Sequence, residues 1–191
     1  MSRLAFLILF FLLPALAHAA PDVAGSPAGW HAAGKDPGSY EMTLDRSFSH
    51  SGAGSGCIKA IGKPNGFGTL MQTFRADAYR GKRIRMWAYA KYSSVQKWAG
   101  LWLRVDVQDK SVSFDNMQNR PLKGTQLWQR YSIVLDVPTD ATKIAFGILL
   151  DGQGAVWVDD FQFEEVGKDV PVTDLHGNDP KNPQNLQFEE K

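Results

Sequence analysis

The sequence predicts an all-β protein, a jelly-roll β-sandwich of two antiparallel sheets. Short segments alternate apolar and polar residues with a period of two, which is the pattern of strands that bury one face. Gly, Pro, Asp or Asn bound each segment, as expected for turns, and no segment shows a convincing helical period. About eight short strands without helices are typical of a sandwich or jelly roll.

Residues 1–19 have the features of a secretory signal peptide and are set apart from the fold. Arg3 gives a positive start, residues 4–13 form an apolar run too short to span a membrane, and Ala17-His18-Ala19 is a small-x-small cleavage site. No cysteine stands next to that site, so no lipid anchor is expected. We therefore expect a periplasmic or secreted protein.

One domain follows the signal peptide. Residues 20–38 are rich in Pro, Gly and Ala and form an irregular lead-in with Trp30 as its only large anchor. Residues 39–167 hold the jelly-roll module, and residues 168–191 form a polar tail. The expected strands cover residues 40–44, 57–61, 69–74, 83–91, 99–108, 128–137, 144–150 and 155–163.

Turn-forming residues set the boundaries of these strands, and the positions of their apolar residues indicate which face is buried. A Ser/Gly turn at residues 50–56 and a Gly/Pro/Asn turn at residues 62–66 enclose the second strand. In the last strand Val156 and Val158 stand at even positions, whereas Phe161 and Phe163 stand at odd ones. If all four face the core, the strand must contain an extra residue, so we predict a β-bulge at residues 159–160. The strand expected at the centre of the core carries Ile144, Phe146, Ile148 and Leu150 on one face.

Charge and cysteine content limit the classes of function. The chain has 21 Lys and Arg and 20 Asp and Glu; removal of the signal peptide takes away only Arg3, which leaves 20 of each. Proteins that bind nucleic acid usually carry a basic excess, so nucleic acid is not expected as a partner. The single cysteine, Cys57, is expected to be buried in a strand, with a reactive thiol or an intermolecular bridge as alternatives.

The two middle strands carry aromatic residues on their polar faces. Strand 99–108 directs Leu101, Leu103 and Val105 into the core and its alternate residues outward. Flat rings beside hydrogen-bonding groups suit a saccharide or a similar small polar ligand. The predicted ligand-binding residues are Trp87, Tyr89, Trp102, Arg104, Asp106, Asp115 and Asn116. The alternative is that loop 114–119 covers this face and closes it into the core.

Patterns that indicate catalysis are scarce. Outside the signal peptide the histidines are His31, His50 and His176, and none has a metal-ligand spacing or a neighbouring nucleophile. The glycine clusters are interpreted as turns. We therefore expect a non-catalytic protein that requires no cofactor. An acid pair for glycan hydrolysis, the alternative, would have to come from Asp106, Asp115, Asp151 or Asp159.

Several motifs carry a family resemblance. They are Trp30, His50-Ser51-Gly52, the strand entry YRGKRIR, the tetrapeptide WQRY and the terminal VWVDDFQF. With these motifs the chain resembles a carbohydrate-binding-module-type jelly roll of the galactose-binding-like superfamily. More narrowly, GFGTLMQTFRADAYRGKRIR, WAGLWLRVD, FDNMQNRPLKGT and IAFGILLDGQGAVWVDDFQFE resemble an uncharacterised module that also occurs attached to bacterial transcriptional regulators. The resemblance covers residues 28–167 and implies the fold, which hosts many functions.

The resemblance has two further implications. Members of the wider family often hold a structural calcium ion with a carboxylate of the last strand, which here falls on Asp160 or Asp159. Related modules open with an Asn-Leu-x-Phe-Glu strand, and here that pattern stands at residues 185–189 instead. Either Leu186 and Phe188 add an edge strand, in cis or swapped within a dimer, or the segment is the unattached tail of a monomer.

These observations favour an exported, non-catalytic module that binds a saccharide or similar small polar ligand on an aromatic sheet face. One alternative is a protein-interaction or sensing domain without sugar binding, which the occurrence beside regulators suggests. The other is a small glycan hydrolase that uses an acidic pair. The expected partners are the small ligand and a protein, without nucleic acid and without a membrane span.

Overall fold

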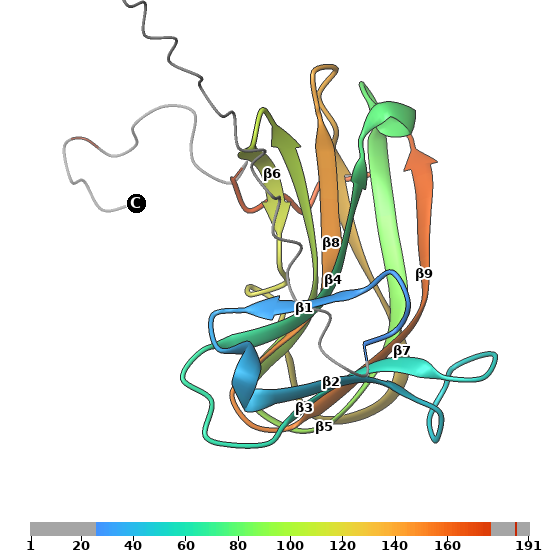
Figure 1. Ribbon diagram of the computed structural model, residues 1–191. Coiled ribbons are helices and arrows are strands. Elements are labelled where there is room, and N and C mark those ends of the chain that lie inside the picture. Colours follow the sequence, from blue (N-terminus) through green and yellow to red (C-terminus); the bar gives the residue numbers. More distant parts are fainter. Residues whose placement is uncertain (1–25, 177–185, 187–191) are drawn as a thin grey trace, which may run out of the picture.

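The computed structural model describes residues 26–176 and residue 186, which form antiparallel strands and two short 3-10 helices (Figure 1). The expected signal peptide, residues 1–19, lies outside the described residues. No helix in the described part is long and apolar enough to cross a membrane. The elements are β1 (His31–Gly34), η1 (Pro37–Ser39), β2 (Tyr40–Asp45), β3 (Ser55–Ala60), β4 (Phe67–Arg75), η2 (Asp77–Tyr79), β5 (Arg83–Val107), β6 (Lys110–Asp115), β7 (Leu122–Asp136), β8 (Lys143–Asp151) and β9 (Ala155–Val166).

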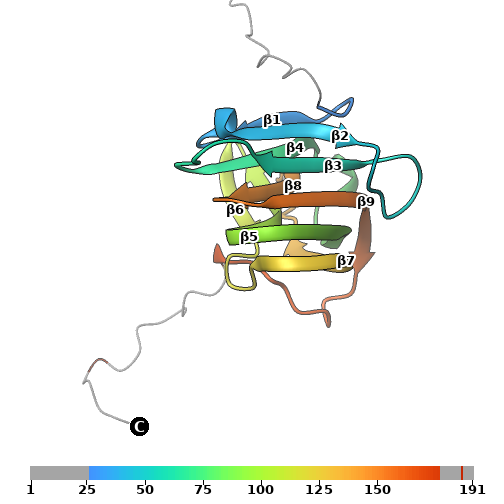
Figure 2. The same ribbon diagram turned by 90° about the horizontal axis from the view of Figure 1, so that it is seen from below.

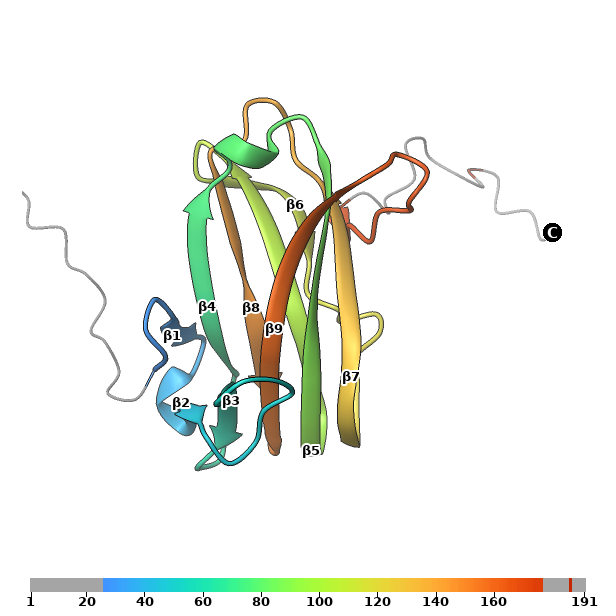
Figure 3. The ribbon, with the colours of Figure 1, turned by 90° about the vertical axis from the view of Figure 1, so that its right-hand side faces the viewer.

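The strands form two layers that pack face to face. Hydrogen-bonded neighbours follow the order β1-β4-β8-β5-β9-β3-β2, and β6 and β7 also pair with β5. The first layer contains β1, β4, β8, the second half of β5, and β6; the second contains β2, β3, β9, the first half of β5, and β7 (Figures 2 and 3). The prediction of an all-β jelly-roll sandwich is confirmed.

β5 belongs to both layers. Its first half pairs with β7 and β9, and from Trp98 to Asp106 it pairs with β8. Between the halves the register to β7 shifts three times, and Ser94 has a positive φ of 54°. The strand therefore bends from one layer into the other. The sequence predicted separate strands at residues 83–91 and 99–108, which the structure joins.

The bend changes which residues of β5 face the core. Core residues have even numbers over residues 84–92 and odd numbers over residues 99–105. Both halves bury one face in the same core, so their outer faces lie on opposite sides of the sandwich. This corrects the prediction of a single aromatic face: Trp87 and Tyr89 lie on the outside of the second layer, and Trp102 on the outside of the first.

A β-bulge interrupts β9 where the sequence predicted it. Two residues of β9 lie opposite Ala88 of β5, and Asp160 has a φ of 55°. The extra residue changes the parity of the strand, so that Phe161 and Phe163 pack against the core after the two valines have done so. The predicted bulge is confirmed.

Phe146 of β8 lies at the centre of a group of aromatic rings. Its ring centroid is between 4.9 and 5.9 Å from those of Trp30, Phe74, Phe161 and Phe163. Trp30, the anchor expected in the lead-in, thus packs on the same residue as the end of the last strand. One side chain connects both ends of the module.

Replacement of Phe146 with alanine is expected to lower the free energy of unfolding by about 3–5 kcal/mol, because it removes buried surface and leaves a cavity. Chemical denaturation measures the loss. Leu127→Ala, at an exposed position of β7, is the control and should change stability by less than about 0.5 kcal/mol. A loss below about 1 kcal/mol for Phe146→Ala would place this strand outside the centre of the core.

Cys57 is buried in β3, as predicted. It packs with Ala155 and Trp157 in a small cluster on the outside of the second layer. Burial raises the pKa of its thiol to about 12. The thiol therefore stays protonated near neutral pH, where only the thiolate would be a strong nucleophile.

An ion-pair network attaches the beginning of the tail to the sandwich. The Arg83 guanidinium donates two hydrogen bonds to Asp136, each 2.9 Å long, and two more to the carbonyl oxygens of Lys168 and Val170. The Lys168 ammonium lies 2.7 Å from Asp136. Of the edge strand predicted at residues 185–189 only Leu186 is described; it is 72% exposed, and the added strand stays a prediction.

Asp136 is expected to contribute stability that acid removes. The hydrogen bond from Arg83, together with that from Lys168, lowers its pKa to about 2. The contribution is complete above the ordinary pKa of 3.8 and is lost as the pH falls from there through about 2. In thermal melts, the melting temperature of Asp136→Asn should therefore lie below that of the wild type by a constant difference above about pH 5. This difference should shrink as the pH falls further. A difference that does not change between neutral pH and the acid end would contradict this assignment.

Candidate functional site

A cleft of about 380 Å³ opens on the outer face of the first layer, and all five strands of that layer contribute to it. Its walls are mainly aromatic and apolar with a few polar groups, a composition found in sites for small ligands. The large apolar residues of the lining are Phe67, Met71, Trp98, Trp102, Phe114 and Leu149. The polar ones are Thr69, Arg104 and Asn116.

Trp102 forms the floor of the cleft. It lies opposite Gly147 of β8, so no side chain separates its indole from β4. The indole Nε1 donates to the Thr69 hydroxyl at 2.7 Å, and that hydroxyl donates to the Ile148 carbonyl at 2.8 Å. A methyl group on Gly147 would collide with the backbone of Leu70. Trp102 is only 7% exposed, so it can offer a ligand part of its ring but not its N–H.

Asp106 holds Arg104 at the wall of the cleft. Nε and Nη2 of Arg104 donate to Oδ2 of Asp106 at 3.2 and 2.9 Å. Nε also lies 2.9 Å from Oδ1, but this contact lacks the alignment of a hydrogen bond, and Oδ1 has no other partner among the described residues. The Asp106 side chain is 6% exposed and that of Arg104 is 42% exposed. Asp106 therefore affects the cleft through Arg104, outside the lining itself.

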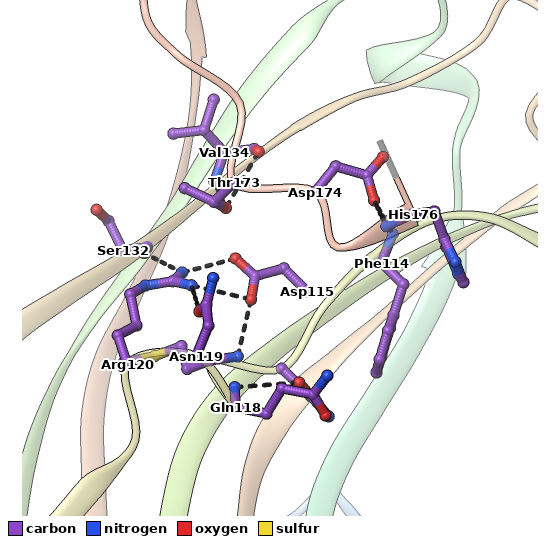
Figure 4. A network of polar contacts seen from close by, with 12 residues as sticks. Phe114, Asp115, Gln118, Asn119, Arg120, Ser132, Val134, Thr173, Asp174 and His176 are labelled. Atoms are coloured by element: carbon purple, nitrogen blue, oxygen red, sulfur yellow. Dashed lines mark hydrogen bonds and ion pairs between the residues drawn. The ribbon is translucent and has the colours of Figure 1, made fainter. Parts of the chain in front are cut away.

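The loop after β6 brings Asn116 to the cleft and keeps Asp115 away from it. Asp115 is fully buried, and its carboxylate accepts two hydrogen bonds from Arg120, at 2.6 and 3.1 Å, and one from the Met117 N–H, at 2.8 Å (Figure 4). A methyl group on Gly100 would come within 2.7 Å of the Asn116 carbonyl oxygen, so this glycine lets the loop approach. The structure thus corrects the expected position of Asp115, which fixes the loop.

Residues 173–176, here called the strap, connect the edges of the two layers (Figure 4). At one end the Thr173 N–H donates to the Val134 carbonyl of β7 at 2.8 Å. At the other end the Phe114 N–H of β6 donates to the Asp174 carboxylate at 3.0 Å, and the Leu175 N–H donates to the Phe114 carbonyl at 2.7 Å. Because Phe114 lines the cleft, the strap supports part of the cleft wall.

Asp174→Ala is expected to loosen Phe114 without unfolding the protein, because one edge hydrogen bond of β6 is lost. Amide hydrogen exchange at Phe114 should become at least about tenfold faster, while global stability falls by about 1 kcal/mol or less. Asp140→Ala, in the exposed β7–β8 loop, is the control and should leave this exchange rate unchanged. An unchanged rate in Asp174→Ala would show that the strap does not support the wall.

Trp87 and Tyr89 belong to a separate surface on the second layer. The ring of Tyr89 stacks on that of His50, with centroids 3.5 Å apart and planes inclined by 10°. The Arg130 guanidinium carbon lies 5.5 Å from the Trp87 ring centroid, beside a polar hollow of about 290 Å³. Of the predicted ligand-binding residues, the cleft brings together Trp102, Arg104 and Asn116; ligand binding by these residues stays a prediction.

The two aspartates predicted as calcium ligands bind the loop before β3. Asp159 accepts hydrogen bonds from the backbone N–H groups of His50 and Ser51 at 3.0 Å and from that of Asp160 at 2.8 Å. Asp160 lies 2.6 Å from the His50 ring nitrogen and accepts from the Ser51 hydroxyl at 2.7 Å, and these bonds lower its pKa.

All four carboxylate oxygens of this pair are thus engaged by the protein. Within residues 26–176 no group of three His, Cys, Asp or Glu side chains could hold a metal. Calcium takes six to eight oxygen ligands, so this arrangement does not fit a calcium site as it stands. The calcium ion remains a prediction from the resemblance.

Several residues that line the cleft were not among the ligand-binding residues predicted from the sequence. Phe114 pairs with Arg104 across β5 and β6, and Thr69 and Met71 come from β4, beyond β8. Alternation within the expected strand 69–74 could have placed Thr69 and Met71 on an outer face. Trp98 lies one residue before the expected strand 99–108; the alternation of that strand, extended by one residue, would have placed it on the same outer face as Trp102.

No protein-family model matches the chain. In sequence the chain is similar to a Bacillus subtilis protein named as the uncharacterised HTH-type transcriptional regulator YbfP, with 46% identity over 171 residues. The match covers 85% of this chain and 57% of that protein. The chain therefore spans little more than half the length of this relative.

Solved structures with similar folds include two xylan-binding domains and a cyclase. The CBM22-1 xylan-binding domain of Paenibacillus barcinonensis Xyn10C has a TM-score of 0.52 and 17% identity, covering 74% of this chain and 88% of its own. Another xylan-binding domain of CBM 22 has a TM-score of 0.54 and 14% identity, covering 74% and 90%. The Stig cyclase Fisc of Fischerella sp. TAU has a TM-score of 0.52 and 11% identity, covering 80% and 92%. The chain thus has the jelly-roll fold that carbohydrate-binding modules have, and its sequence resembles part of a transcriptional regulator.

Proposed function

We propose that this chain is a non-catalytic binding module that holds a saccharide, or a similar small polar ligand, in the cleft of the first layer. The observation that carries this proposal is the aromatic cleft itself. Trp102 forms the floor, Trp98 and Phe114 line the walls, and Arg104 and Asn116 provide polar groups. Aromatic rings bind the C–H faces of sugars, and a few placed polar groups orient the ligand.

Comparison of folds and of side chains supports binding over catalysis. Two of the structurally similar proteins are named as xylan-binding domains. Because a cyclase has a similar fold, the side chains of the cleft are the stronger support. Glycoside hydrolysis usually needs a pair of carboxyl groups, and in the described part of the chain the cleft lining contains no acidic side chain.

Trp102→Ala is expected to weaken glycan binding by about 1–3 kcal/mol, because the ligand loses its aromatic floor. A glycan array identifies ligands, and isothermal titration calorimetry measures their affinities. Trp87→Ala, on the outside of the second layer, is the matched control and should leave the affinity unchanged. If a correctly folded Trp102→Ala variant binds like the wild type, or if only Trp87→Ala weakens binding, the ligand does not occupy this cleft.

A ligand-sensing or protein-interaction domain is the second candidate function. The sequence similarity to an HTH-type regulator favours it. Co-purification of a specific protein partner, together with a negative glycan array, would support this candidate over saccharide binding. Turnover of a glycan by the purified chain would instead support a hydrolase.

We also propose that the module acts outside the cytoplasm, on the basis of the signal-peptide features of residues 1–19. Fractionation and mass spectrometry of the expressed protein test this proposal. A periplasmic or secreted chain that begins just after residue 19 would support it. A cytoplasmic chain that retains these residues would contradict it.

A further inference from the structure

The polar groups that the cleft side chains leave free for a ligand are hydrogen-bond donors. The Trp102 N–H is bound to Thr69, and the Thr69 hydroxyl is bound on both sides, by Trp102 and by the Ile148 carbonyl. The side-chain oxygen of Asn116 accepts the Gln118 N–H at 3.2 Å, and its amide nitrogen donates no hydrogen bond within the described residues. Because Asn116 lines the cleft, its two N–H groups are available to a ligand there.

Arg104 presents one open edge of its guanidinium group. Asp106 occupies the Nε and Nη2 side. Nη1 makes no hydrogen bond to the described residues, and the side chain is 42% exposed. The edge formed by Nη1 and Nη2 matches a carboxylate, which it can bind through two parallel hydrogen bonds. Because Asp106 already orients the guanidinium, less side-chain entropy is lost when a ligand binds.

This set of donors discriminates between ligands. A hydroxyl group both donates and accepts hydrogen bonds, whereas an ionised carboxylate only accepts them. At the position beside Arg104, a hydroxyl group would leave its own donor without a side-chain acceptor, whereas a carboxylate has no donor and can accept hydrogen bonds at both oxygens. The remaining lining is aromatic and apolar and suits the face of a sugar ring.

We infer that the cleft selects a saccharide that carries a carboxylate, that is, a uronic acid residue. The carboxylate lies on the open edge of Arg104 beside Asn116, and the sugar ring lies over Trp102. This inference rests on the proposed saccharide-binding function and names its ligand class. Asp106 balances the charge of Arg104, so the selection depends on directed hydrogen bonds more than on net charge and should persist in moderate salt.

Matched glycans test the inference separately from the proposed function. The probes are oligosaccharides of glucuronic or galacturonic acid and the same oligosaccharides after reduction of each carboxyl group to hydroxymethyl. Isothermal titration with the full chain should show at least about tenfold tighter binding of the acidic form. Equal or tighter binding of the reduced form overturns the inference and leaves saccharide binding in place. Binding of neither form, with a negative array of neutral glycans, overturns both.

Variants of Arg104 test whether this residue causes the preference for the acidic oligosaccharides. Arg104→Gln should bind the acidic form no better than the reduced form. Because this change leaves the buried Asp106 without its cation, Arg104→Lys is the second variant: it keeps a cation there, lacks the guanidinium edge, and should also lose the preference. Arg130→Gln makes the same change of charge on the second layer and should keep the preference. If folded Arg104→Gln and Arg104→Lys retain the preference, the inference is wrong.

Discussion

The passage of β5 through both layers is the constraint around which the rest of the structure is arranged. Before the bend β5 pairs with β7 and β9, and after it with β8 and β6, so both halves are central strands. The turn between β8 and β9 crosses between the layers beside this bend, since Asp151 at the end of β8 pairs with Trp98 and Ala155 at the start of β9 pairs with Ser93. A backbone hydrogen bond of 3.0 Å from Gln96 to Gln153 joins the two crossings. β5 therefore supplies a central strand to each layer.

The floor of the cleft follows from small residues in β8. Ala145 and Gly147 leave space on the outside of the first layer, and the indole of Trp102 fills it from the neighbouring strand. Its hydrogen bond to Thr69 spans three strands, which holds the ring in one orientation. A preorganised aromatic floor reduces the entropy lost when a ligand binds.

Two buried carboxylates support the polar side of the cleft without lining it. Asp106 orients Arg104, and Asp115 fixes the loop that carries Asn116 through its bonds to Arg120. Removal of one partner from a buried pair leaves an uncompensated charge, so each carboxylate depends on its arginine. The strap continues this support on the other side of β6, where its hydrogen bonds to Phe114 occupy a strand edge that would otherwise be open.

The sequence by itself determined most of the strands, their buried faces and the bulge in β9. It predicted neither β1, which lies within the expected irregular lead-in of residues 20–38, nor β6. Alternation over residues 101–105 and 144–150 predicted the core correctly, because neighbouring side chains of a strand point to opposite sides. The same rule put Trp102 and Arg104 on one outer face. The burial of Cys57 was predicted on another ground, that a free cysteine in a strand is usually buried.

Only the tertiary structure decided which outer faces meet. The bend in β5 separated Trp87 from Trp102, and strand pairing brought Thr69 and Phe114 to the cleft from distant parts of the chain. The burial of Asp115 depends on Arg120 and on the loop between them. Periodicity sets the direction of a side chain relative to its own strand. Contacts between strands depend on hydrogen-bonded pairing over the whole chain, and no local pattern contains that information.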